Sequence, residues 1–188
     1  MNLWPLIITF FIIGAAELGD KTQLLTLGFA ARYSIGKVVA AVFLATALVM
    51  ALAVFFGEVI NYYVPTFYVQ LFTGILFVLF GLWILRGEKE EEKEIKGNAN
   101  LFWIVFASFL FAELGDKTQL ATFALSAKYG TPFQVWLGAT LGMAGVNSLG
   151  ALIGGGIKKH VSENLVKWVG ALVFIVFGLV TLGDLFIW

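Results

Sequence analysis

The sequence contains no cysteine, one histidine and three prolines among its 188 residues. The absence of cysteine excludes disulfides and thiolate metal sites, and one histidine cannot form the imidazole cluster that zinc and copper prefer. His160 is expected in a loop between Lys158 and the segment that follows. Without a Cys/His or Ser/His nucleophile arrangement, the sequence predicts a protein that is not an enzyme.

Charged residues are also scarce. They make up 13% of the chain, against about 25% in soluble domains, while 60% of the residues are hydrophobic. Twelve basic and twelve acidic residues balance, which argues against a nucleic-acid partner, since such a partner calls for clustered basic surface. Together with a mean hydropathy of +0.93, these values predict an integral membrane protein whose partners include the lipid bilayer. The N-terminus lacks the basic region of a cleaved signal, so the first apolar segment is expected to be retained.

Six segments have the roughly 20 apolar residues that a membrane-spanning helix needs. The sequence therefore predicts an all-α membrane protein with six transmembrane helices. These are expected at about Leu3 to Ala31, Val38 to Ile60, Thr66 to Leu85, Leu101 to Ala127, Phe133 to Ile157 and Leu165 to Trp188. Short breaks rich in charge, Pro, Gly or Asn separate most of them, and the stretch Arg86 to Asn100 is a linker with nine charged residues in fifteen.

The chain repeats itself. Residues 17–23, ELGDKTQ, return unchanged as residues 113–119, and the apolar run 74–82 resembles 171–179 at an offset of 97. Three helices per unit is an odd number, so the second unit must enter the membrane from the opposite side. The predicted organisation is a first three-helix repeat at 1–86, a charged cytoplasmic linker at 87–100 and a second, inverted three-helix repeat at 101–188.

Lysine and arginine predict the orientation. Lys128 alone falls on one side of the membrane, and Lys21 and Lys117 fall within it. The other side holds the remaining nine: Arg32, Lys37, Arg86, Lys89, Lys93, Lys96, Lys158, Lys159 and Lys167. This bias makes the crowded side cytoplasmic and places both termini outside.

The repeated motif puts charge inside two apolar segments, at a cost of about 2.5–3.5 kcal/mol per charged residue on insertion scales. In a regular helix Glu17, Asp20 and Lys21 would share one face about 100° wide. The i,i+4 spacing from Glu17 to Lys21 would permit an ion pair and leave Asp20 as the less compensated charge. The second copy has the same arrangement in Glu113, Asp116 and Lys117.

The glycines of the motif open an alternative. Gly19 and Gly115 allow close backbone approach, or a local break that frees carbonyl oxygens to line a cavity. Thr22 and Thr118 turn toward the acids only if the helix breaks at the glycine, and in a regular helix they bond to the preceding turn. The sequence leaves both conformations open.

Charge balance points to the chemistry of the site. The two motifs together carry four carboxylates and two lysines, and the net charge of minus two matches one divalent cation or two protons. Oxygen ligands suit hard cations such as Ca²⁺, Mg²⁺ and Mn²⁺. A buried carboxylate takes up protons more readily, whereas a bound cation expels them, so exchange of cations against protons follows.

Two Glu-x-Gly-Asp-Lys-Thr motifs, one in each half of a small six-helix protein, resemble those of the GDT1 family of manganese and calcium transporters. The resemblance covers essentially the whole chain. It implies an exchanger that moves Mn²⁺ or Ca²⁺ out of the cytosol, in exchange for protons, with no permanently bound cofactor. It also implies a metal site of six residues: Glu17, Asp20, Thr22, Glu113, Asp116 and Thr118, with Lys21 and Lys117 compensating charge.

Other features are less specific. Gln23, Gln119 and Asn147 are candidates to support the ligands without touching the cation, or to bond helix to helix. The short chain without a targeting extension fits a prokaryotic cell (inner) membrane, and homo-oligomer formation is left open. A passive divalent-cation channel and an exporter of small organic cations or amino acids are the alternative functions.

Overall fold

The computed structural model describes residues 3–86, 101–153 and 163–187, and every regular element in these ranges is an α-helix. The charged linker at 87–100 and His160 lie outside the described residues. The helices are α1 (Trp4–Glu17), α2 (Lys21–Arg32), α3 (Ile35–Tyr63), α4 (Thr66–Arg86), α5 (Leu101–Glu113), α6 (Lys117–Tyr129), α7 (Pro132–Ile153) and α8 (Glu163–Ile187).

Three of these helices are long and apolar enough to cross a membrane on their own. The qualifying stretches are Ile35–Tyr63, Thr66–Trp83 and Pro132–Leu152, and shorter apolar stretches lie in α1, α5 and α8. Many large hydrophobic side chains are exposed on the described surface, as expected where lipid replaces water. The chain is therefore an all-α, multi-pass membrane protein.

Two of the segments expected from the sequence are each divided into two helices by the repeated motif. α1 ends at Glu17 and α2 begins at Lys21, while α5 ends at Glu113 and α6 begins at Lys117. Gly19 has a φ of 74° and Gly115 a φ of 82°, and a left-handed residue cannot continue a right-handed helix. A regular helix through the motif was therefore the wrong alternative, and the break at glycine is confirmed.

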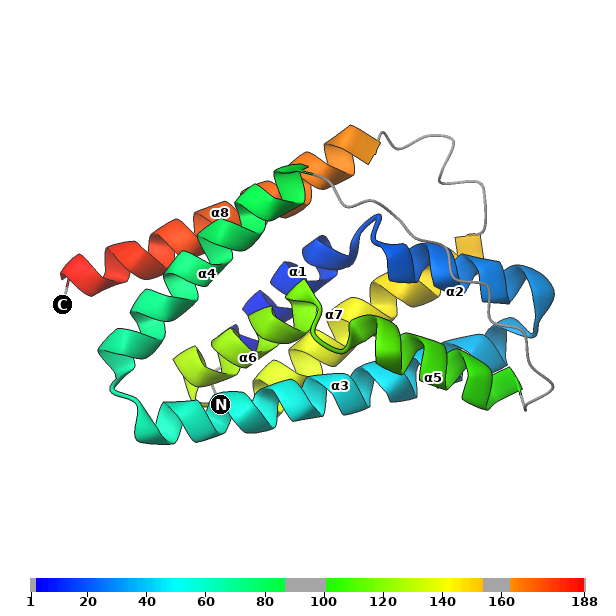
Figure 1. Ribbon diagram of the computed structural model, residues 1–188, viewed down its shortest axis with the longest axis horizontal. Helices are drawn as coiled ribbons and strands as arrows, with labels where there is room; N and C mark the ends of the chain where they lie inside the picture. The colour runs from blue at the N-terminus through cyan, green and yellow to red at the C-terminus, as the bar shows by residue number, and fades with distance from the viewer. Residues whose placement is uncertain (1–2, 87–100, 154–162, 188) are drawn as a thin grey trace.

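Corresponding helices of the two halves run in opposite directions (Figure 1). In that view α1 and α2 run from left to right, whereas α5 and α6 run from right to left. The two breaks meet near the middle of the molecule, where an ion pair joins them. α3 and α7 are likewise opposed, as are α4 and α8.

The first turns of α3 and α7 show which residues of the two halves correspond to each other. The carbonyl of Ser34 accepts from the N–H groups of Lys37 and Val38, and that of Thr131 accepts from Gln134 and Val135. These positions differ by 97, whereas the motifs differ by 96. The extra residue is Gly130, which ends α6 with a φ of 58° and donates its N–H to the carbonyl of Ser126.

α4 and α8 contact each other through matched pairs of residues: each contact has an equivalent formed by the corresponding residues of the other half. A Cβ added at Gly178 would lie 2.8 Å from the carbonyl oxygen of Gly74, and one added at Gly81 would lie 2.9 Å from that of Ala171. At the offset of 97, Ala171 is the counterpart of Gly74, and Gly178 that of Gly81. Reciprocal contacts of this kind are typical of a two-fold relationship.

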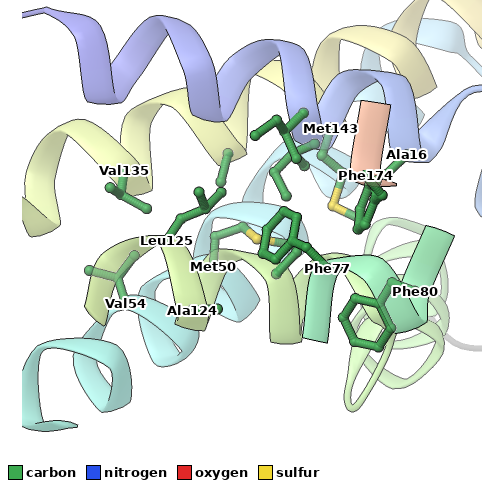
Figure 2. Close-up of a cluster of buried hydrophobic side chains, with 14 of the residues drawn as sticks. Ala16, Met50, Val54, Phe77, Phe80, Ala124, Leu125, Val135, Met143 and Phe174 are labelled. Atoms are coloured by element: carbon green, nitrogen blue, oxygen red, sulfur yellow. The ribbon is translucent and has the colours of Figure 1, made fainter. Parts of the chain in front are cut away.

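The same relationship runs through the aromatic core. Phe77 stacks on its own counterpart Phe174, with ring centroids 5.1 Å apart, and the pair Phe80–Phe174 is matched by Phe77–Phe177. Phe77, Phe80 and Phe174 belong to a buried cluster that draws on α1, α3, α4, α6, α7 and α8 (Figure 2), and Phe177 packs against it. Because Ala16 of this cluster precedes Glu17 directly, the core lies against the first break.

Small residues bring α1 close to α7. A Cβ added at Gly138 would lie 2.5 Å from the carbonyl oxygen of Leu6, and one added at Gly142 would lie 2.6 Å from that of Phe10. This close backbone approach carries the following turns of α7 past the end of α1. It is what places Asn147 beside Glu17.

Candidate cation site

Each break is closed by the glutamine of its own motif. The side-chain oxygen of Gln23 accepts from the N–H of Gly19 at 3.0 Å, and that of Gln119 accepts from Gly115 at 2.6 Å. Gln23 also donates to the carbonyl of Val146 in α7 at 3.5 Å. The two glutamines therefore support the turns that carry the acids, and Gln23 ties its turn to the second half.

Glu17 ends α1 with no exposed surface. Its Oε1 accepts a hydrogen bond from the hydroxyl of Thr22 across the break, and a second from Asn147 Nδ2 at 3.0 Å. Thr22 and Asn147 are also fully buried. The break at Gly19 thus brings Thr22 to the acid, as the sequence required for any role of this hydroxyl.

The second break repeats this arrangement in part. Glu113 ends α5, and its Oε2 accepts from the hydroxyl of Thr118 at 3.3 Å, with both residues fully buried. Asp116 precedes α6 in an extended conformation, with φ −74° and ψ 164°, and is 8% exposed. The acids therefore lie at helix ends, where backbone N–H and C=O groups have no hydrogen-bond partner within the helix.

Asp20 and Lys117 join the two motifs. Lys117 Nζ lies 2.7 Å from Asp20 Oδ2, and each side chain is 6% exposed. Asp20 is therefore compensated by the lysine of the other repeat, and the prediction that it would be the less compensated acid was wrong. The regular helix assumed for that prediction could only pair charges within one segment. The side chain of Lys21 lies outside the described part of the structure.

The acids of the two motifs meet through this ion pair rather than in a single cluster. Within the described ranges, no three acidic or histidine side chains lie close enough together to hold a metal ion. A site to which all four acids contribute stays a prediction.

Sequence reasoning missed two features of the site. The first is the partner of Lys117, which is 97 positions away in the chain. The second is the residue of the first half that corresponds to Asn147. It was missed because the extra residue Gly130 changes the offset between the two halves from 96 to 97 after the motif. At the offset of 97 that counterpart is Met50, and the insertion of Gly130 is the signal that would have identified it.

The fold and the buried charges define a class of protein. A multi-pass membrane protein whose two apolar segments are interrupted at buried acids, with a buried lysine at the second interruption, has the features of an ion transporter. No solved structure matches this chain significantly.

The chain belongs to the GDT1 family. The family model "Divalent cation/proton antiporter GDT1" matches residues 5–92 and 101–186. Relatives include a protein of Vibrio cholerae serotype O1 named "Putative manganese exporter", 36% identical over 94% of this chain and 89% of the relative. A GDT1-like protein of Synechocystis is 31% identical over 90% and 92%, and protein PAM71 of Arabidopsis thaliana is 30% identical over 94% and 56%. The family comprises transporters rather than enzymes, and its substrates are divalent cations.

Proposed function

We propose that this protein exports a divalent cation from the cytosol in exchange for protons, through one site to which both motifs contribute. The observation that carries the proposal is the buried ion pair between Lys117 and Asp20, which brings the two motifs together. The family description supports a divalent cation and a proton as the exchanged ions. The relative named as a manganese exporter favours Mn²⁺ over Ca²⁺.

The site consists of oxygen donors. Glu17, Asp20, Glu113 and Asp116 supply carboxylates, and all four are at most 8% exposed. The hydroxyls of Thr22 and Thr118, already directed at the glutamates, complete the set. Oxygen donors of this kind suit Mn²⁺ and Ca²⁺.

Exchange follows from the cost of buried charge. In the described conformation Lys117 compensates Asp20, and a cation entering the site takes over this role as it binds the carboxylate. An acid that binds a cation must give up its proton, so cation and protons occupy the site in turn. Lys21 and Lys117 keep the net charge of the two motifs at minus two.

The proposed architecture is six membrane crossings arranged as two inverted three-helix repeats, with the broken helices α1–α2 and α5–α6 each forming one crossing. The reciprocal contacts between α4 and α8 support it, as do the opposed directions of corresponding helices. Alternating access then comes from rocking one repeat against the other around the breaks. The Lys/Arg bias supports a cytoplasmic linker, and the bacterial relative supports the cell (inner) membrane.

Cation flux in proteoliposomes tests the proposal. Purified protein is reconstituted, and Mn²⁺ and Ca²⁺ uptake is followed with and without an imposed pH gradient, with empty liposomes and the Asp116→Asn variant as controls. We expect uphill Mn²⁺ movement driven by the gradient, accompanied by proton movement in the opposite direction. Downhill flux indifferent to the gradient would establish a channel instead. Transport of small organic cations without metal flux would establish an exporter of organic cations instead.

A further inference from the structure

Glu17 uses only one of its two carboxylate oxygens. Oε1 accepts hydrogen bonds from Thr22 and Asn147. Oε2 is buried and accepts none from the residues that the structure describes. A fully buried carboxylate oxygen without a donor is costly, so this atom is placed where a positively charged or donating ligand would be favourable.

Asn147 has the matching property. Its Nδ2 donates to Glu17, while its Oδ1 is buried and has no hydrogen-bond partner among the described residues. The residue has no exposed surface, and the close approach of α7 to α1 holds it there. Two adjoining side chains thus each keep a buried oxygen with unused lone pairs.

The other half of the molecule lacks this arrangement. The counterpart of Asn147 is Met50, which is also fully buried. Its sulfur accepts from the hydroxyl of Thr122 at 3.2 Å. A thioether is a soft, weak acceptor that does not suit hard cations, so Glu113 has no oxygen donor in α3 equivalent to the amide in α7.

We propose that Asn147 is a cation ligand, and that its Oδ1 and Glu17 Oε2 together hold the divalent cation in the half of the site between α1 and α7. The two halves are therefore unequal: the Glu17 half adds an amide oxygen to its carboxylates and hydroxyl, and the Glu113 half contributes only its carboxylates and the hydroxyl of Thr118. The inference rests on the proposed function, and it adds a ligand that lies outside both motifs.

Direct binding tests the inference. Mn²⁺ binding is measured by electron paramagnetic resonance on wild-type protein and variants in lipid nanodiscs. Asn147→Leu removes the oxygen and is expected to raise the Kd for Mn²⁺ at least tenfold. Asn147→Asp keeps an oxygen and adds charge, so its Kd is expected to stay within threefold of wild type or to fall. Met50→Leu, at the equivalent position, is the matched control and is expected to change Kd less than twofold.

A merely structural asparagine gives a different pattern. If Asn147 acts only as a hydrogen-bond donor to Glu17, then Asn147→Asp removes the donor, places a second carboxylate beside Glu17 and raises Kd as much as Asn147→Leu does. That result, or an unchanged Kd in Asn147→Leu, overturns the inference. If Asn147→Leu does not fold, the aspartate variant decides the question alone.

Failure of the inference is distinguishable from failure of the proposed function. If wild-type protein moves Mn²⁺ in proteoliposomes and Asn147→Leu has an unchanged Kd, the role of Asn147 as a ligand is rejected and the transport function stands. If wild-type protein neither binds nor moves a divalent cation, both are rejected.

Discussion

Lys117 of the second motif pairs with Asp20 of the first, with 2.7 Å between Nζ and Oδ2. The pair joins the start of α6 to the break between α1 and α2, so a lysine of the second half neutralises an acid of the first. Taking both ions out of water is expensive, and the attraction between them offsets the cost only while both are present.

Removing the lysine is therefore expected to destabilise the protein. Lys117→Met leaves Asp20 without its ammonium partner, and breaking a buried pair costs about 3–5 kcal/mol. Reversible unfolding in mixed detergent micelles measures the change, with the double variant Asp20→Asn/Lys117→Met closing the cycle. We expect the double variant to recover part of the loss. Additive effects of the two single substitutions would show that the pair is not coupled.

Neutralising Asp20 or Asp116 is expected to abolish transport in protein that still folds, although Asp20→Asn also leaves Lys117 without its partner and lowers stability. Asp20→Asn and Asp116→Asn each remove a negative charge that the cation would bind while nearly preserving side-chain volume. Mn²⁺ flux in proteoliposomes is the measurement, and size-exclusion profiles in detergent verify folding. Wild-type flux in both variants would contradict the assignment of these residues to the site.

The break at Gly115 is expected to depend on its left-handed backbone rather than on lack of space. A Cβ added there meets nothing within 4 Å, yet φ is 82°. Gly115→Ala should cost about 1–2 kcal/mol, since a side chain is disfavoured in this conformation. The control is Gly28→Ala, in the interior of α2, where an added Cβ also meets nothing within 4 Å. Thermal unfolding is measured for both variants. Alanine at Gly28 should be neutral or slightly stabilising, and equal losses at both positions would refute the argument.

The contact between α4 and α8 is expected to tolerate no added volume on its reciprocal glycines. Gly178→Ala would place a Cβ 2.8 Å from the carbonyl oxygen of Gly74, which forces the helices apart at a cost of about 1–3 kcal/mol. Gly183→Ala, on the same helix, meets nothing within 4 Å and serves as the control. Unfolding midpoints of the two variants should differ clearly, and the same midpoint for both would argue against close packing.

Long apolar runs made α3 and α4 predictable almost to their ends. Val38 to Ile60 was expected where α3 spans Ile35–Tyr63, and Thr66 to Leu85 where α4 spans Thr66–Arg86. Burial in an apolar environment and hydrogen-bond satisfaction within one segment depend on local composition, so the sequence contains the information directly.

The conformation of the motif was not predictable in the same way. Glycine permits both a regular helix and a left-handed turn, and the choice at Gly19 depends on bonds made by Gln23 and by α7. The pairing of Lys117 with Asp20 depends in turn on how two distant breaks meet in space. Local sequence therefore identified the acids of the candidate site and left their partners undetermined.

The correspondence between positions of α3 and α7 has a consequence for how such a protein can evolve. Phe77 stacks on its own counterpart Phe174, so a change to either ring affects both halves at once. Away from this pair, Met50 and Asn147 occupy equivalent positions with different chemistry. A homodimer encoded by one short gene could never hold methionine on one side and asparagine on the other. Carrying both copies in a single chain removes that constraint and leaves each half free to specialise.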